Sequence, residues 1–543
     1  MADESADESA DETGLDVVVI GAGFAGLYAL HRLRDGLGLR TRVFEAGDGV
    51  GGTWYWNRYP GARCDSESYI YSYSFSKELE QEWLWSSKYP EQPEILRYLN
   101  HVADRFDLRR DITLGARVRS AHYDESGPCW RIETDRGERV SARFLVTAVG
   151  CLSAANVPQI PGLDRFAGRW VHTGQWPAEG VDFAGQRVGL IGTGSTGIQA
   201  TPRIAAVARH LTVFQRTPNY TIPARNRALT AADWDEIKAI YPEIRQRARD
   251  GRAGFPFTVA GERALDFSEA ERNAVYEALW QEGGFKFLYA SFGDILRDKA
   301  ANETASEFVR QKIRAIVKDP EIARRLCPTD HPYGSKRPPI DTDYFETYNR
   351  ANVTLVDLRE SPLVEITPGG IRTQNAEHPV DLIVFATGFD AMTGSLLRMD
   401  VRGTGGRRLA EAWADGPRTY LGLQTAGFPN LFTITGPGSP SVLVNMPVAI
   451  EQHVDWIADC IDHLRRNGLS RIEARLDAQD AWVDHVNEAA RETLFYEAKS
   501  WYLGCNIPGK PEVFMPYVGG QPAYRDRCDA VARAGYTGFA LHP

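Results

Sequence analysis

Two glycine-rich segments have the residue types and spacing to hold the pyrophosphate of a dinucleotide. Gly21-Ala22-Gly23-Phe24-Ala25-Gly26 and Gly192-Thr193-Gly194-Ser195-Thr196-Gly197 both read G-x-G-x-x-G, between an apolar run and a helix-like stretch. Glycine permits a tight turn and a close approach of the backbone to a phosphate at a helix N-terminus. One such segment is weak support because glycine is common in turns, but two in this setting predict two dinucleotide sites.

The residue found 24 positions after the first glycine differs between the two segments. It is Glu45 after Gly21 and Arg216 after Gly192. A carboxylate accepts hydrogen bonds from ribose hydroxyls and repels a 2′-phosphate, whereas a guanidinium binds that phosphate. We therefore predict FAD at the first site and NADPH/NADP+ at the second.

The surrounding pattern predicts the elements that must position these turns. Consecutive apolar residues at 17–20 and 188–191 are typical of parallel strands buried on both faces. Matching apolar runs end at Gly150 and Gly388, where the chain can leave each sheet. The predicted fold is α/β, with two dinucleotide-binding, Rossmann-like domains of the flavoprotein monooxygenase type and a helical insertion. A long helix around 448–466 is expected to end at Asn467-Gly468.

The helical insertion is predicted from a charge-rich segment. Two capping-box patterns within it, Thr230-x-x-Asp233 and Ser268-x-x-Glu271, mark the expected starts of helices. The predicted divisions are a disordered acidic tail (1–14), the FAD-binding domain in two parts (15–150 and 389–543), the NADP-binding domain in two parts (151–225 and 333–388) and the helical insertion (226–332).

Composition excludes several classes of partner. The chain of 543 residues has a formal charge of −10, but its first 13 residues carry six acids and no base, so the remainder is nearly balanced. Neither nucleic acid nor an anionic membrane is an expected partner. The sequence shows no run of 18 apolar residues and no signal pattern, which predicts a cytoplasmic protein. The seven cysteines lack a C-x-x-C pair and zinc spacing, so we expect neither a disulfide reductase nor a metal site.

Two longer signatures narrow the class of flavoprotein. The segment from Phe166 to Pro177 matches F-x-G-x-x-x-H-x-x-x-W-P, and the segment from Gly51 to Asp65 matches G-G-x-W-x-x-x-x-Y-P-G-x-x-x-D. With both glycine turns, these motifs cover most of the chain in order. The chain resembles the type I Baeyer–Villiger monooxygenases, particularly those acting on phenylacetone, steroids and cyclohexanone.

The resemblance implies a reaction cycle. In this family NADPH reduces FAD, NADP+ stays bound, and dioxygen forms a C4a-peroxyflavin that converts a ketone into an ester or lactone. Such a peroxide needs a fixed positive charge in a closed site. The resemblance assigns that charge to Arg337, positioned by Asp65, and implies an apolar cyclic or aryl ketone and dioxygen as the small-molecule partners.

The resemblance also assigns the binding residues. His172 would couple domain movement to cofactor chemistry rather than act as acid or base, and segments 436–446 and 500–504 would be mobile loops. For FAD the residues are Gly21, Gly23, Ala25, Gly26, Glu45, Thr53, Trp54, Tyr55, Trp56, Asp65, Tyr71, Val118 and Met446. For NADP they are Arg63, Cys64, Thr193, Gly194, Ser195, Thr196, Gly197, Gln199, Arg216, Thr217, Lys336, Arg337 and Trp501. For substrate they are Cys151, Leu152, Leu443 and Met446.

Two alternatives stay open at this stage. A flavin-containing monooxygenase that oxygenates nitrogen or sulfur shares much of the pattern, although not the Trp176-Pro177 ending or the Arg337 context. A flavin-binding redox sensor without turnover would share the fold. The sequence does not identify the ketone and is compatible with a monomer.

Overall fold

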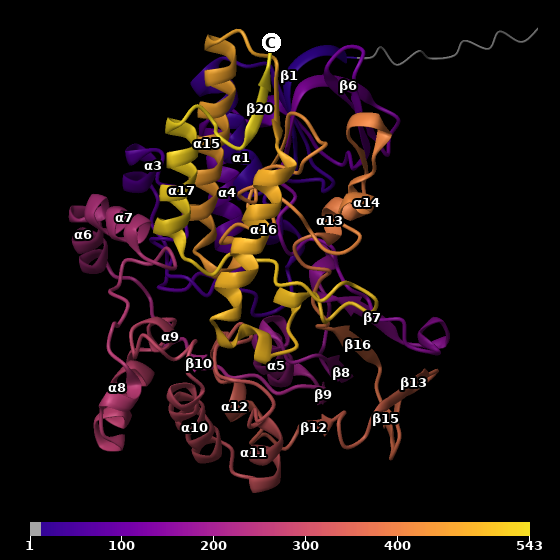
Figure 1. Ribbon diagram of the computed structural model, residues 1–543. Coiled ribbons are helices and arrows are strands. Elements are labelled where there is room, and N and C mark those ends of the chain that lie inside the picture. The colour runs from indigo at the N-terminus through magenta and orange to yellow at the C-terminus, as the bar shows by residue number, and fades with distance from the viewer. Residues whose placement is uncertain (1–11) are drawn as a thin grey trace, which may run out of the picture.

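The computed structural model describes residues 12–543 (Figure 1). Most of the predicted acidic tail, residues 1–11, therefore lies outside the described part. Strand β1 begins at Glu12, three residues before the predicted start of the first domain, because the backbone at Glu12 pairs with Val140 of a neighbouring strand.

The first sheet is built around β1 (Glu12–Ile20), which pairs in parallel with its neighbours on both sides. Among residues 12–543 this sheet has eight strands in the order β17-β4-β5-β6-β1-β2-β3, with β18 also pairing with β6. The chain thus returns to this sheet after residue 389. Its other strands are β2 (Thr41–Phe44), β3 (Ile112–Thr113), β4 (Val118–Asp124), β5 (Cys129–Thr134), β6 (Arg139–Thr147), β17 (Asp400–Arg402) and β18 (Leu431–Thr433).

The second sheet is fully parallel and lies at the other end of the molecule (Figure 1). Its order is β12-β9-β8-β16-β7. The two sheets confirm the predicted fold class of paired Rossmann-like domains. The strands are β7 (Arg169–His172), β8 (Arg187–Ile191), β9 (His210–Gln215), β12 (Val353–Asp357) and β16 (Leu382–Phe385).

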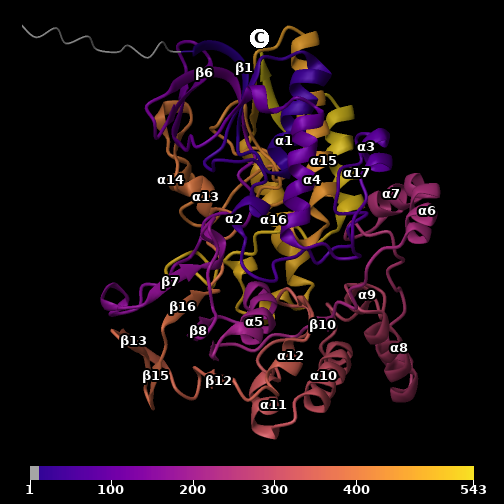
Figure 2. The same cartoon turned by 180° about the vertical axis from the view of Figure 1, so that it is seen from behind.

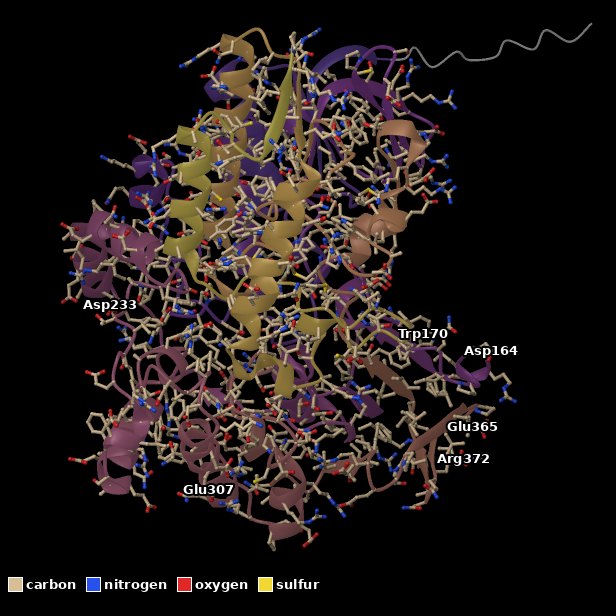
Figure 3. The ribbon with its side chains drawn as sticks, viewed as in Figure 1. Asp164, Trp170, Asp233, Glu307, Glu365 and Arg372 are labelled. Carbon is tan, nitrogen blue, oxygen red and sulfur yellow. The ribbon has the colours of Figure 1, made fainter. Side chains whose placement is uncertain are left out.

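Three shorter pairings complete the strands. An antiparallel sheet of β13 (Leu363–Thr367), β14 (Gly370–Thr373) and β15 (Glu377–Pro379) projects beside β7, where Figure 3 labels Trp170, Glu365 and Arg372. The other pairs are β10 (Ile222–Pro223) with β11 (Ile340–Asp341), and β19 (Arg471–Ala474) with β20 (Phe539–His542).

Helices pack on the first sheet through continuous apolar faces. Helix α1 (Phe24–Leu30) starts at the first glycine turn, is buried along its whole length and contacts α15 (Met446–Arg466). As predicted, α15 ends with Asn467 as its C-cap, followed by Gly468 at a φ of +64°. Figure 2 shows α1 and α4 from behind. The remaining helices of this region are α2 (Thr53–Trp56), α3 (Lys77–Glu82), α4 (Gln92–Arg105), α13 (Gly394–Leu397), α14 (Leu409–Ala412), α16 (Leu476–Arg491) and α17 (Gln521–Arg533).

The predicted helical insertion divides its packing between the two ends of the molecule. Trp234 of α6 (Ala231–Ala239) and Tyr241 of α7 (Tyr241–Asp250) join the apolar core of the first sheet. The later helices join the core of the second sheet, together with α5 (Ser195–Val207) and α12 (Tyr344–Thr347). In Figure 3, Asp233 and Glu307 mark these separate parts. The later helices are α8 (Glu269–Glu282), α9 (Lys286–Tyr289), α10 (Lys299–Ile316) and α11 (Pro320–Leu326).

Both predicted capping boxes are formed. The side chains of Thr230 and Ser268 each accept a hydrogen bond from the third backbone amide of the following helix. In return, the carboxylates of Asp233 and Glu271 accept from the backbone amides of Thr230 and Ser268. These local signals set where the insertion helices start.

Candidate active site

The two glycine turns have the same internal geometry. Gly21 and Gly192 have φ values of +103° and +113°, which disfavour any residue with a Cβ. A Cβ on Gly26 would lie 1.7 Å from the carbonyl oxygen of Gly21, and one on Gly197 would lie 2.1 Å from that of Gly192. The first and last glycines of each turn therefore let the helix start close against its strand.

The middle glycine of the second turn has a different function. Gly194 is the N-cap of α5 with an ordinary φ of −82°, and a Cβ there would meet nothing within 4 Å. The space over the helix N-terminus is open, so the backbone amides there can receive a phosphate group. This cradle fits the pyrophosphate of a dinucleotide.

The carboxylate of Glu45 is bound to the first glycine turn. Its oxygens accept hydrogen bonds from the backbone amides of Ala22 and Gly47, each at 2.7 Å. Burial raises the pKa of Glu45 while these amides oppose that shift. The carboxylate is held at the end of β2, where a ribose of the first dinucleotide would lie.

Arg216 and Lys336 form a pair of neighbouring cations beside the second turn. Burial lowers the pKa of Lys336, Asp330 opposes this, and the charge of Arg216 lowers it further. The described residues give the exposed Arg216 side chain neither a hydrogen bond nor an ion pair, and Thr193 Oγ1 donates to the Thr217 carbonyl at 2.8 Å. Two repelling cations fit a dianionic group such as a 2′-phosphate.

Arg337 lies at the centre of a buried cluster that joins distant segments. Its Nη2 is 3.5 Å from Oδ2 of Asp65, its Nη1 donates to the Val442 carbonyl at 3.1 Å, and its guanidinium lies 5.1 Å from the ring centre of Phe285. Burial works against this charge, but Asp65 and the neighbouring Tyr502, Tyr289 and Cys64 together oppose it, so the pKa of Arg337 is raised. Asp65 is 8% exposed, and burial raises its pKa while Arg337 opposes that shift.

Gln199 of α5 connects the second turn to the loop that carries Asp65. Its Oε1 accepts from the Tyr59 hydroxyl at 2.7 Å, and its Nε2 donates to the Arg63 carbonyl at 3.2 Å and to Asp65 Oδ1 at 3.4 Å. The Arg63 side chain makes an ion pair with Glu91 at 2.5 Å. The polar end of Gln199 is thus bonded to the loop that carries Asp65, and its part in binding NADP stays a prediction.

The predicted aromatic residues lie next to the first turn. Trp54 is buried and its Nε1 donates to the Tyr71 hydroxyl at 3.2 Å. Tyr55 and Trp56 are half-buried in α2, and the Arg58 guanidinium stacks 4.2 Å from the ring centre of Tyr55. These rings bring apolar surface to the first dinucleotide site.

His172 lies at the end of β7 and is bonded to neighbouring residues of the second-sheet region. Its Nδ1 accepts from the amide of Gly174 at 3.0 Å, so the ring proton is on Nε2, which lies 3.3 Å from Thr387 Oγ1. Burial lowers the pKa of His172 to about 4. A neutral, fully bonded imidazole of this kind is a structural link at the exit of β16.

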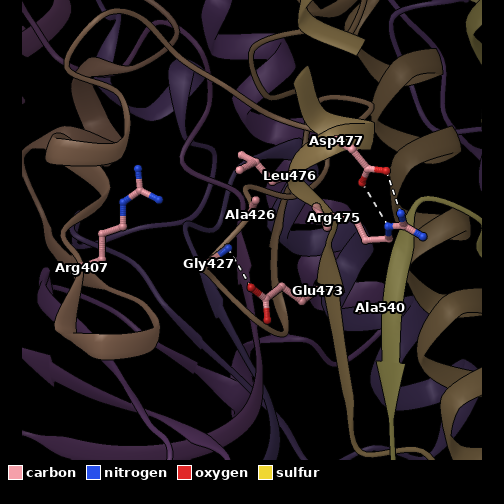
Figure 4. A pocket seen from close by; sticks show the side chains of 9 residues that line it. Arg407, Ala426, Gly427, Glu473, Arg475, Leu476, Asp477 and Ala540 are labelled. Atoms are coloured by element: carbon pink, nitrogen blue, oxygen red, sulfur yellow. Dashed lines mark hydrogen bonds and ion pairs between the residues drawn. The ribbon is translucent and has the colours of Figure 1, made fainter. Parts of the chain in front are cut away.

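The space beside Arg337 is nearly closed. The side chains around Arg337 enclose a cavity of about 20 Å³, a volume that holds about one water molecule. A larger groove of about 460 Å³ lies between β19, β20 and the 404–408 turn (Figure 4), but none of its lining residues belongs to the cluster described above. The small cavity is the one that adjoins the Arg337 guanidinium. Its lining residues are Phe285, Leu288, Tyr289, Leu296, Gly334, Arg337, Pro338, Val442, Leu443, Phe495 and Tyr502.

Known proteins resemble the chain over nearly its whole length. The family model described as pyridine nucleotide-disulphide oxidoreductase matches residues 15–239. A Baeyer–Villiger monooxygenase of Pseudooceanicola batsensis is 47% identical, with 96% of this chain and 95% of that protein aligned. The chain is a member of the Baeyer–Villiger monooxygenases.

Two further relatives refine this assignment. A solved structure described as an oxidised steroid monooxygenase bound to NADP is 56% identical, with a TM-score of 0.93 over 98% of this chain and 99% of the other. A phenazine N-monooxygenase of Lysobacter antibioticus is 48% identical over 98% of both chains. Similar solved structures hold FAD with NADP. The predicted family, fold, enzyme class and the cofactors FAD and NADP are confirmed.

The remaining predicted residues of this monooxygenase lie as follows. Thr53 is exposed at the start of α2, Val118 is buried at the start of β4, and Met446 is half-buried as the first residue of α15. Cys64 is buried, and Trp501 is half-buried with its ring centre 4.3 Å from that of Tyr502. Leu152 and Leu443 are half-buried, whereas Cys151 is 7% exposed.

Sequence reasoning missed several neighbours of Arg337. Phe285 and Tyr289 come from the insertion, and Tyr502 stands next to Trp501 in the late loop. Only Tyr502 carried a signal, because it lies within a segment that matched the family. No helix within 12–543 has the length and apolarity needed to cross a membrane.

Proposed function

We propose that this monooxygenase oxidises apolar cyclic or aryl ketones to lactones or esters, using NADPH and dioxygen. The observation that carries the proposal is the half-buried Arg337 guanidinium, held by the buried Asp65 and the Val442 carbonyl beside an apolar cavity. A fixed positive charge in a dry site stabilises an oxyanion far more than one in water.

The cofactor residues are assigned by the same geometry. When bound, FAD would supply oxygen activation and NADPH the hydride. Gly21, Gly23, Gly26 and Glu45 would hold the FAD pyrophosphate and ribose, as the closed turn and the buried carboxylate support. The N-terminus of α5 would hold the NADP pyrophosphate.

Selection for the 2′-phosphate would come from Arg216, Lys336 and Thr217, supported by the mutual repulsion of the two cations. Trp501 would cover the cofactor from the late loop. Leu443 and Met446 would face the ketone.

Arg337 would stabilise negative charge on the attacking oxygen and then on the adduct with the ketone. Its pKa keeps it charged at any working pH. Asp65 would orient it without being the proton donor, and Gln199 would hold the Asp65 loop against α5. Because the cavity holds about one water, the ketone enters only after a loop moves.

The test replaces Arg337. Arg337→Ala is expected to leave flavin reduction by NADPH measurable and to lower ester formation by roughly 100-fold or more. Arg187→Ala, which removes an exposed ion pair with Asp381, is the matched control and should change neither rate. Equal loss of both rates in Arg337→Ala would mean that Arg337 is structural.

A second candidate is oxygenation of an aromatic ring nitrogen. It is favoured by the 48% identity to a phenazine N-monooxygenase. Phenazine N-oxide formed without any ester from ketones would decide for it. We also propose a cytoplasmic location, supported by the seven free cysteines.

A further inference from the structure

Three residues with a left-handed backbone conformation surround Cys151, two of them in contact with its thiol. Met392, Thr435 and Ser441 have φ values of +66°, +53° and +43°, a region that residues with a Cβ other than Asn and Asp rarely adopt. The Met392 amide donates to the Cys151 carbonyl at 2.7 Å, and the Cys151 Sγ lies 3.6 Å from the Thr435 carbonyl oxygen and 3.0 Å from Ser441 Oγ. Such conformations persist only where neighbouring groups hold them.

The closest of these contacts is the hydrogen bond between Cys151 Sγ and Ser441 Oγ at 3.0 Å, in which either group can donate. Both groups also reach the Thr435 carbonyl oxygen, the thiol at 3.6 Å and the hydroxyl at 3.1 Å. The thiol and the hydroxyl are thus bonded to each other and to the same carbonyl. Burial raises the pKa of Cys151, so the thiol keeps the proton that this contact needs.

Ser441 sets the position of a carbonyl that binds Arg337. It opens a 3₁₀ turn, Ser441–Leu443, which is closed by the Val444 amide donating to the Ser441 carbonyl at 3.1 Å. Within this turn the Val442 carbonyl accepts from Arg337 Nη1 at 3.1 Å. A change at Ser441 is thus passed to the guanidinium through a single residue.

We propose that Cys151 is a positioning residue whose thiol holds Ser441 in its left-handed conformation and so keeps the Val442 carbonyl on Arg337. Cys151 then influences the reaction through the loop rather than by touching the ketone, in line with its 7% exposure. The consequence for catalysis rests on the function proposed above for Arg337.

The first experiment measures amide hydrogen exchange in the full chain with FAD and NADP+ bound. Cys151→Ala should speed exchange of the Val444 amide by roughly two- to tenfold, the effect of one lost hydrogen bond. Cys151→Ser, whose hydroxyl can still donate, should stay within about twofold of the unmodified enzyme. Cys460→Ala is the matched control, because Cys460 is also a buried free cysteine but belongs to the core of the first sheet, whereas Cys151 packs with Val442 in another cluster.

A double-mutant cycle with Ser441 tests the same contact. Ser441→Gly removes the strain and the hydroxyl together, so Cys151→Ala should add little further exchange on that background. Unchanged exchange in Cys151→Ala, equal exchange in Cys151→Ser and Cys151→Ala, or full additivity with Ser441→Gly would each overturn the proposal.

Product analysis separates this inference from the proposed function. Cys151→Ala should form less ester per NADPH and release more hydrogen peroxide, and Cys151→Ser should restore the ratio. Faster loop exchange with an unchanged ester ratio would overturn the link to Arg337. Faster exchange in an enzyme that oxidises no ketone at all would leave the loop contact standing and refute the proposed function instead.

Discussion

Gly194 and Gly197 lie three residues apart in one turn, yet their replacement by alanine should fail in different ways. A Cβ at Gly197 would lie 2.1 Å from the Gly192 carbonyl oxygen, whereas real Cβ contacts essentially never fall below 3.0 Å. The start of α5 must therefore move by about 1 Å against β8, an overpacking that costs roughly 1–3 kcal/mol of unfolding free energy. Gly197→Ala should be destabilised and weakened in NADPH binding together.

Gly194→Ala should keep the fold and lose the cofactor. Its Cβ meets no protein atom within 4 Å and its φ is −82°, so the loss of stability should be about 1 kcal/mol or less. The methyl group would occupy the space over the helix N-terminus, and losing charge-assisted contacts there costs about 1–3 kcal/mol, or roughly five- to 150-fold in Kd.

The assay combines thermal unfolding, FAD absorbance and calorimetric titration with NADPH on both variants. Normal FAD content with weakened NADPH binding in Gly194→Ala is the expected result. NADPH affinity unchanged in Gly194→Ala would refute the assignment of this turn, and full stability of Gly197→Ala would refute the steric argument.

Three other changes follow from the same geometry. Arg216→Ala should raise the KM for NADPH far more than that for NADH, by about 1–3 kcal/mol, and steady-state kinetics with an unchanged preference would contradict this. Burial raises the pKa of Asp341 to about 7, well above its value in the unfolded chain. Between about pH 4 and pH 7 the folded state therefore keeps a proton that the unfolded state has lost, so the free energy of unfolding falls as the pH rises. At about 1.4 kcal/mol per pH unit the total loss is roughly 4 kcal/mol. Denaturant titrations should show this fall in the unmodified enzyme and a flatter profile in Asp341→Asn; parallel profiles would exclude Asp341 as the source. Arg245→Met should leave the Glu80 carboxylate, which is 9% exposed, without its ion-pair partner at 2.6 Å. The expected cost is about 3–5 kcal/mol of unfolding free energy. The double variant Arg245→Met/Glu80→Leu should recover much of that free energy in the same denaturant titrations.

Local patterns were sufficient to predict the two cofactor turns and the helix starts. The glycine spacing, the contrast between Glu45 and Arg216, and the capping boxes at Thr230 and Ser268 each involve residues close in sequence. Their physical requirements, a tight turn or a bonded amide, are met within a few residues. The structure therefore reproduces these features without depending on the rest of the fold.

The cluster around Arg337 could not be derived from local pattern. Its members Asp65, Phe285, Val442 and Tyr502 come from four distant segments, and only the packed chain brings them together. Helical periodicity likewise does not reveal which apolar face a helix will meet. For that reason the division of the insertion between the two domains emerged only from the structure.

The most direct test of the central claim is product analysis with isotopically labelled dioxygen. The purified enzyme with FAD and NADPH would be offered cyclohexanone, larger ring ketones, phenylacetone and a steroid ketone. We expect an ester or lactone that contains one atom from dioxygen, formed in a near-equal ratio to the NADPH consumed. NADPH oxidation that yields only hydrogen peroxide with every ketone, or oxygen transfer to nitrogen alone, would contradict it.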